Sequence, residues 1–224
     1  MKLLKKGVAA LLCLVLVTLT GCTTQKTEEN TYFGKLFPIY VDTDVVAEKC
    51  YLYDGPFVED GSFEEKQGVV ALKVSNIGEK DIQLLRIHVT TSEKELLFEI
   101  TTFRAGATVI VLEKNAQTLS ENEKLLEFKA EDRVDFTHTL SVHEDVFVLQ
   151  VNNGTFNLKN ISKTAIDSDI FIYYKKKDAD GNYFGGTTFR SRAAGGLDIG
   201  EIAQLPASNF NLSDSEVLFV DYAK

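Results

Sequence analysis

Three oxygen-bearing side chains, Asp178, Asp180 and Asn182, occupy alternate positions of one short segment. Calcium-binding loops place oxygen ligands in the same order, but they need a glycine in the sixth position and a glutamate in the twelfth. Here Gly181 stands fourth and no glutamate stands twelfth. An Asp-Gly pair between apolar β-forming segments is typical of a hairpin turn. We therefore expect a turn without a bound metal, and these three residues remain the candidate ligands.

Few other residues could carry chemistry. His88, His138 and His143 lack the spacing of a zinc site, and Cys50, in a largely apolar setting, is expected to be a small core residue. The sequence contains no Gly-x-Ser-x-Gly motif, no P-loop and no dinucleotide-binding fingerprint. We therefore expect a protein without enzymatic activity and without a cofactor.

Acidic residues dominate the charge. The chain carries a formal net charge of −9, and removal of residues 1–21, which hold three lysines and no acid, changes it to −12. Such a surface argues against nucleic acid as a partner. Five carboxylates gather among glycines and a proline in residues 54–67. A solvated loop is the usual meaning of such a segment; a weak cation site and a partner-binding loop remain as alternatives.

The tetrapeptide Thr-Thr-Phe-Arg occurs twice, at residues 101–104 and 187–190, an offset of 86. The same offset gives nine identities in the 37 columns that begin at Gly68, so a duplication is indicated. Relative to the second copy, the first has about fifteen extra residues near 54–67. We expect Phe103 and Phe189 in cores and Arg104 and Arg190 exposed, with a bulge or bend after Phe98 and after Phe184; a recurring ligand-contact role of the motif is the alternative. In the second copy, Gly185-Gly186 would mark this bulge or bend.

Short apolar runs separated by turn residues predict strands, at 69–74, 84–89, 96–103, 109–112, 147–151, 170–174, 183–189 and 217–222. This pattern predicts an all-β chain of two tandem antiparallel β-sandwiches, repeat 1 over 34–136 and repeat 2 over 137–224. One helical excursion is expected over 120–127, where Ser120 and Glu123 fit a capping box.

The amino-terminal residues predict location. Lys2, Lys5 and Lys6 precede an apolar run over 8–17, which is shorter than the roughly 20 residues of a membrane-spanning helix. The following Leu-Thr-Gly-Cys ends at Cys22 and resembles the lipobox of bacterial lipoproteins. The resemblance implies a signal peptide over 1–21, diacylglycerol on Cys22, a tether over 22–33 and a membrane-anchored chain on the extracytoplasmic face. An ordinary secretory leader and an uncleaved anchor are the alternatives.

A second resemblance concerns repeat 2. The aromatic run at 171–174, the Asp-Gly turn at 180–181, Thr-Thr-Phe at 187–189 and Leu-Asp-Ile-Gly-Glu at 197–201 resemble, in order, the FxLYD-type domains of bacterial surface proteins. Tyr173-Tyr174 replaces the expected Leu-Tyr-Asp, and Ile199 replaces the expected proline. The resemblance implies an immunoglobulin-like sandwich and no catalytic residues.

Two functions follow from these features. The first is a non-enzymatic envelope lipoprotein, anchored through Cys22, whose sandwiches act as interaction or spacer modules for an envelope protein partner. The second is an accessory lipoprotein, for example of a transporter, that binds a small ligand or a cation. It would use residues 54–67 or the aromatic surface of Tyr173, Tyr174 and Tyr183.

Overall fold

The computed structural model describes residues 31–32 and 36–223, which form fourteen β-strands and no helix. The all-β prediction is therefore confirmed. None of these residues lies in a helix that is long and apolar enough to cross a membrane. The proposed leader and Cys22 lie outside the described residues. The strands are β1 (Thr31–Tyr32), β2 (Ile39–Asp42), β3 (Val45–Phe57), β4 (Glu64–Asn76), β5 (Ile82–Thr91), β6 (Glu95–Phe103), β7 (Thr108–Leu112), β8 (Leu125–Asp135), β9 (Phe147–Asn152), β10 (Thr155–Asn160), β11 (Ile170–Lys177), β12 (Tyr183–Ala193), β13 (Ile202–Pro206) and β14 (Ser215–Tyr222).

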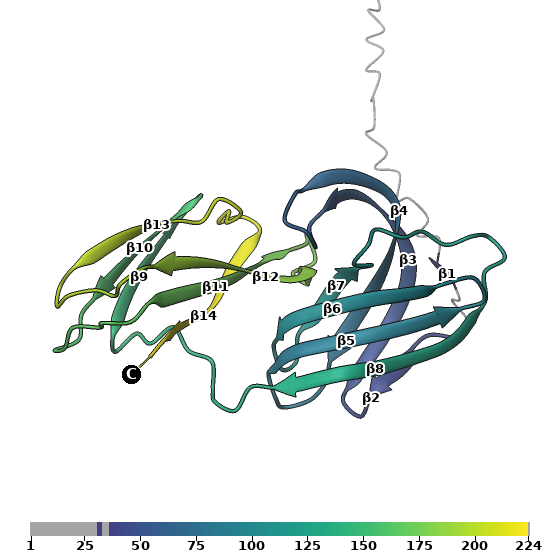
Figure 1. Cartoon of the computed structure of the whole chain (residues 1–224), viewed down its shortest axis with the longest axis horizontal. Coiled ribbons are helices and arrows are strands. Elements are labelled where there is room, and N and C mark those ends of the chain that lie inside the picture. Colours follow the sequence, from purple (N-terminus) through teal and green to yellow (C-terminus); the bar gives the residue numbers. More distant parts are fainter. Residues whose placement is uncertain (1–30, 33–35, 224) are drawn as a thin grey trace, which may run out of the picture.

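Strands β1–β8 form the first half of the molecule (Figure 1). One layer has the order β1-β3-β4-β7, with β2 also paired to β3, and the other has the order β6-β5-β8. Alternate residues of β5, such as Leu85 and Ile87, are fully buried, because a strand directs successive side chains to opposite faces. They meet Leu72 and Val74 of β4 in one core, so the layers pack face to face.

Strands β9–β14 form the second half, in which β13-β10-β9 is one layer and β12-β11-β14 the other. Its core includes Phe156, Leu158, Ile172 and Val220. This order repeats that of the first half. Strands β9, β10 and β13 correspond to β3, β4 and β7, and strands β12, β11 and β14 correspond to β6, β5 and β8. The second half thus repeats the strand order of the first, an arrangement that is consistent with the duplication predicted from the sequence.

The two Thr-Thr-Phe-Arg motifs do not occupy equivalent positions in the two halves. Phe103 pairs with Ile82, and its carbonyl accepts a hydrogen bond from the Asn76 side chain. Leu197 pairs with Ile166 in the same way, and its carbonyl accepts a hydrogen bond from the Asn160 side chain. The structural equivalent of Phe103 is therefore Leu197 and not Phe189. The gapless 86-residue offset is wrong as a structural alignment, because Asn76 and Asn160 correspond at an offset of 84, whereas Phe103 and Leu197 correspond at an offset of 94.

The bulge of β12 is where the sequence predicts it. The register between β11 and β12 shifts between Phe184 and Phe189, and Gly185 has a φ of +88°. In the first half the backbone bends at Thr102, whose φ is +50°, and Phe98 and Phe103 are both fully buried. Phe189 is half-buried against the second core. Both predicted irregularities are confirmed.

Two predictions near these strands are wrong. Residues 120–127 form a turn and the start of β8, since Leu125 pairs with Thr91 of β5 instead of continuing a helix. The Glu123 carboxylate still accepts a hydrogen bond from the Ser120 amide at 2.9 Å. This is one of the two hydrogen bonds of a capping box, and here it stabilises a turn instead of a helix. Arg104 is half-buried, because it pairs with Asp81.

The two halves share one sheet. Strands β7 and β12 pair in parallel, Val109 opposite Tyr183 and Ile110 opposite Phe184, which joins the two layers into an eight-stranded sheet. Tyr183 and Phe219 of the second half also belong to the first core. Packing and main-chain pairing therefore fix one half against the other.

Candidate binding site at the junction of the halves

The acidic segment 54–67 forms the end of the β3–β4 hairpin, which arches over to the bulge of β12 (Figure 1). Phe63 on this hairpin stacks on Phe189 with ring centroids 5.8 Å apart, and Lys176 lies over the Phe63 ring at 5.5 Å. Gly185 leaves room for Val58, whose Cγ2 would lie 2.5 Å from an added Cβ. The segment predicted to be a solvated loop thus makes an interface within the chain.

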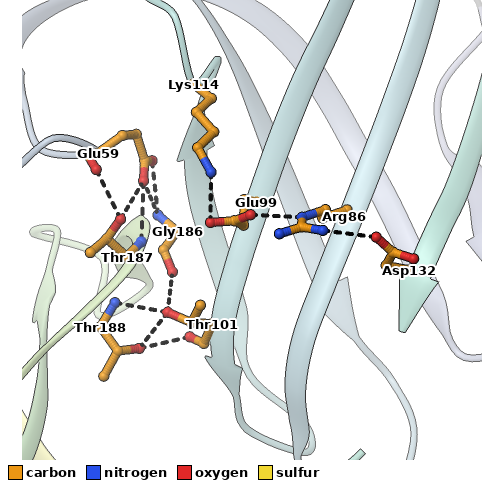
Figure 2. Close-up of polar contacts among 9 residues, drawn as sticks. All are labelled: Glu59, Arg86, Glu99, Thr101, Lys114, Asp132, Gly186, Thr187 and Thr188. Carbon is orange, nitrogen blue, oxygen red and sulfur yellow. Dashed lines mark hydrogen bonds and ion pairs between the residues drawn. The ribbon is translucent and has the colours of Figure 1, made fainter. Parts of the chain in front are cut away.

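Glu59 is the polar centre of this interface (Figure 2). Its carboxylate accepts hydrogen bonds from the amide of Leu112 at 2.9 Å, of Gly186 at 2.8 Å and of Thr187 at 3.1 Å. Burial raises the pKa of Glu59, because the surroundings withdraw the carboxylate from water, while these amides act in the opposite direction. One acidic side chain therefore connects β7, β12 and the hairpin.

Lys175 of β11 lies on the other side of the same bulge. The lysine is fully buried, and its ammonium donates hydrogen bonds to the carbonyls of Gly185 at 3.0 Å, Gly186 at 2.6 Å and Thr187 at 3.2 Å. Burial lowers its pKa to about 7, opposed by the negative charge of Glu59. Glu59 thus binds the amides of the bulge, and Lys175 binds its carbonyls.

Thr101 and Thr188 form a second polar contact between the halves (Figure 2). The Thr188 amide donates to the Thr101 hydroxyl at 2.9 Å, and the Thr188 hydroxyl donates to the Thr101 carbonyl at 2.8 Å. The two copies of Thr-Thr-Phe-Arg therefore meet at the junction, although they are not equivalent in the fold.

A separate ion-pair chain crosses β6, β5 and β8 (Figure 2). Glu99 accepts hydrogen bonds from Lys114 at 2.8 Å and Arg86 at 2.7 Å, and Arg86 also pairs with Asp132 at 2.9 Å. The side chains of Arg86, Lys114 and Asp132 are 40–55% exposed, so the chain contributes little to stability. We assign it no binding role.

Beside the Thr101–Thr188 contact, and lined by both threonines, a cleft of about 410 Å³ opens between the halves. Both halves line it, the first with Gln83, Thr101, Thr102, Phe136, Thr137 and His138, the second with Tyr173, Thr188, Arg190, Phe219 and Asp221. Its volume lies within the roughly 300–1,000 Å³ of small-molecule sites. Aromatic rings, hydroxyl groups and charged groups face the same space, which can therefore both bury and hydrogen-bond a ligand.

The rings of the cleft are in contact with one another. Tyr173 stacks on Phe219 with centroids 4.4 Å apart, Phe219 meets Phe136 edge to face at 5.7 Å, and Phe136 meets His138 at 5.8 Å. These contacts fix the aromatic wall, since paired rings hold each other in place. We call these four residues the aromatic strip.

The predicted site residues fall partly in this cleft. Tyr173 lines it, but Tyr174 and Tyr183 are buried in the two cores. His138 lies in it, while His88 pairs with Glu131 at 3.1 Å and His143 contacts Tyr222. Cys50 is buried as predicted, and its burial raises the pKa of the thiol to about 12.

The candidate metal ligands Asp178, Asp180 and Asn182 form hydrogen bonds with one another within the turn. Asp178 accepts hydrogen bonds from the amides of Asp180 at 2.9 Å and Asn182 at 2.8 Å and from the Asn182 side-chain amide at 2.9 Å. Both carboxylate oxygens of Asp178 therefore accept hydrogen bonds that stabilise the predicted hairpin turn. In the described part of the chain, no cluster of His, Cys, Asp and Glu residues has the geometry to hold a metal ion.

Sequence reasoning overlooked Glu59 and Lys175 as individual residues. Neither belongs to a motif, and Lys175 stands in a run of three lysines that is typical of an exposed surface. The available indication for Lys175 was strand alternation, which places it on the same face as Tyr173. Comparisons with models of protein families, with curated proteins and with solved structures find no significant match.

Proposed function

We propose that this chain is a non-enzymatic bacterial envelope lipoprotein that presents a binding cleft outside the membrane. Residues 1–21 would be removed and Cys22 would carry the lipid. Residues 34–136 and 137–224 would be two immunoglobulin-like sandwiches, the second of the FxLYD type. The repeated strand order of the two halves supports this division.

The observation that carries the proposal is the cleft between two halves that are fixed to each other. Glu59, the β7–β12 pairing and the Thr101–Thr188 contact determine the distance between its walls. A spacer needs no such cleft, whereas an interaction module benefits from walls that are already in place before the partner binds. We therefore favour partner binding over a spacer role.

The cleft also supports a second function, an accessory lipoprotein that binds a small ligand. Its volume and its mixture of rings and hydrogen-bonding groups suit a compound of modest size. The two functions use the same cleft. They differ in what it binds, a partner protein in the first and a small ligand in the second.

Anchoring is tested with Cys22→Ala in the full chain. We expect loss of the lipid by mass spectrometry and release from membranes, because the acyl chains supply the membrane affinity. Cys50→Ala is the matched control and should remain in the membrane fraction. Retention of the Cys22→Ala protein in membranes would count against the proposal.

Partner binding is tested by photocrosslinking in cells. A photoreactive residue at Thr137, which is exposed in the cleft, is compared with one at Leu126, which is 65% exposed on β8 and does not line the cleft. Adducts specific to position 137 support the proposal. Equal labelling from both positions would contradict it.

A further inference from the structure

Arg190 differs from the other arginines of the chain. Each of those pairs with a carboxylate, Arg86 with Glu99, Arg104 with Asp81, Arg133 with Asp135 and Arg192 with Asp169. For Arg190, no carboxylate of residues 36–223 lies within ion-pair distance, and its guanidinium lies over the Phe171 ring at 5.1 Å. This exposed cation on the wall of the cleft is available to a ligand.

Asp221 lies beside the same ring. In the register of β11 and β14 it is the direct partner of Phe171, and it is exposed. Arg190 is the partner of Tyr173, two residues along β11, so alternation places all four side chains on one face of the sheet. A hydrogen-bond donor and a hydrogen-bond acceptor thus flank one aromatic ring.

Two further hollows adjoin the cleft. One of about 300 Å³ shares Phe136, Thr137 and His138 with it, and another of about 410 Å³ shares Asp221. We call the cleft and these two hollows together the groove. Such a groove suits a chain of several units better than a single small molecule.

A hydroxyl group both donates and accepts hydrogen bonds, so neighbouring hydroxyls of one ligand can accept from Arg190 and donate to Asp221. The uncharged side chains of Gln83 and Thr137 offer the same complementarity along the groove. The formal net charge of −9 disfavours a polyanion. An extended peptide would gain most from an open strand edge, but the floor of the groove is the face of a sheet.

From these features we propose that the groove binds a neutral oligosaccharide. Its hydroxyls would be shared between Arg190 and Asp221, and the apolar faces of its rings would rest on Tyr173, Phe136 and His138, the members of the aromatic strip that are not buried. The inference rests on the proposed function, because it names the occupant of the same cleft.

The test is isothermal titration calorimetry on the full chain in a detergent without a sugar head group. Maltohexaose, cellohexaose and chitohexaose are the probes, and hexaglycine is the peptide comparison. We expect at least one saccharide to bind and hexaglycine not to bind. Arg190→Met and Tyr173→Ala should each weaken the binding about tenfold or more, as expected for the loss of a charged hydrogen bond or of a buried ring.

Arg192→Met is the matched control, because Arg192 lies two residues along β12, pairs with Asp169 and does not line the cleft. It should bind within about twofold of the unaltered chain. The inference is overturned if no saccharide binds, if Arg190→Met and Arg192→Met behave alike, or if only hexaglycine binds. Binding of hexaglycine, or specific crosslinks from position 137 to an envelope protein, would leave the proposed function standing.

Discussion

Glu59 and Lys175 bind the same residue, Gly186, from opposite sides. The Glu59 carboxylate accepts the hydrogen bond of the Gly186 amide at 2.8 Å, and the Lys175 ammonium donates to the Gly186 carbonyl at 2.6 Å. One charge comes from the extra hairpin of the first half and the other from β11 of the second half. The bulge of β12 is consequently one of the points at which the two halves are held together.

Glu59→Ala should lower the free energy of unfolding by about 3 kcal/mol, because the buried amides of Leu112, Gly186 and Thr187 lose their acceptor. Urea unfolding measures the change. Glu64→Ala, at a side chain that is 68% exposed on the same hairpin, is the control and should stay within about 0.5 kcal/mol. Similar effects of the two substitutions would contradict the role assigned to Glu59.

The lowered pKa of Lys175 should make the stability of the folded chain depend on pH. Its pKa falls from 10.5 to about 7 on folding, so between these values the unfolded chain binds more protons than the folded one. The free energy of unfolding contributed by this group should therefore rise with pH, by up to about 1.4 kcal/mol per pH unit. Its destabilising effect is complete below pH 7 and vanishes above 10.5.

The contribution is measured as the difference between the chain and its Lys175→Met variant. Urea unfolding between about pH 7.5 and 9.5 stays below the pKa of about 10 that a tyrosine has in an unstructured chain. The difference should change steadily over this interval. A constant difference would show that Lys175 keeps its ordinary pKa in the folded chain.

Gly186→Ala should be among the most damaging small substitutions. A Cβ there would lie 1.9 Å from the main-chain oxygen of Glu99 and 2.9 Å from Val111, and main chain cannot move aside cheaply. We expect a loss of about 3 kcal/mol in the free energy of unfolding. Gly106→Ala is the control, since nothing lies within 4 Å of its added Cβ and only its φ of +71° causes strain, worth about 1 kcal/mol. A smaller loss for Gly186→Ala than for Gly106→Ala would refute the close approach of β6 and β12.

Cys50 should be inert in the folded protein. Its pKa of about 12 leaves almost no thiolate at neutral pH, and the side chain is buried. Iodoacetamide at about pH 8 should label it only after unfolding in urea, as read by mass spectrometry. A cysteine placed at the exposed position of Ser208 by Ser208→Cys should be labelled in the folded chain. Rapid native labelling of Cys50 would exclude its place in the core.

Much of the strand pattern was predictable, because alternation in segments such as Ile82–Thr91 follows directly from burial of one face. The turn at Asp178 and the bulge at Gly185 were predictable for a similar local reason, since each depends on residues with special turn chemistry. The helix over 120–127 failed because pairing with β5 overrode a short local preference.

The site was less predictable than the fold. Glu59 and Arg190 acquire their roles from residues more than a hundred positions away or from a neighbouring strand. The repeated Thr-Thr-Phe-Arg indicated duplication, as expected from the sequence. Its two copies nevertheless lie at different positions of corresponding strands, and they meet through Thr101 and Thr188.

The parallel pairing of β7 with β12 also covers part of one edge strand in each half, at Val109 and Ile110 of β7 and at Tyr183 and Phe184 of β12. Each of these strands would otherwise end its layer with unpaired amides and carbonyls, and Tyr183 and Phe219 would leave the apolar core that covers them. Open strand edges beside apolar surface recruit other chains into aggregates. Expressed apart, the halves would therefore be prone to self-association, so the covalent link between them acts as a safeguard of solubility.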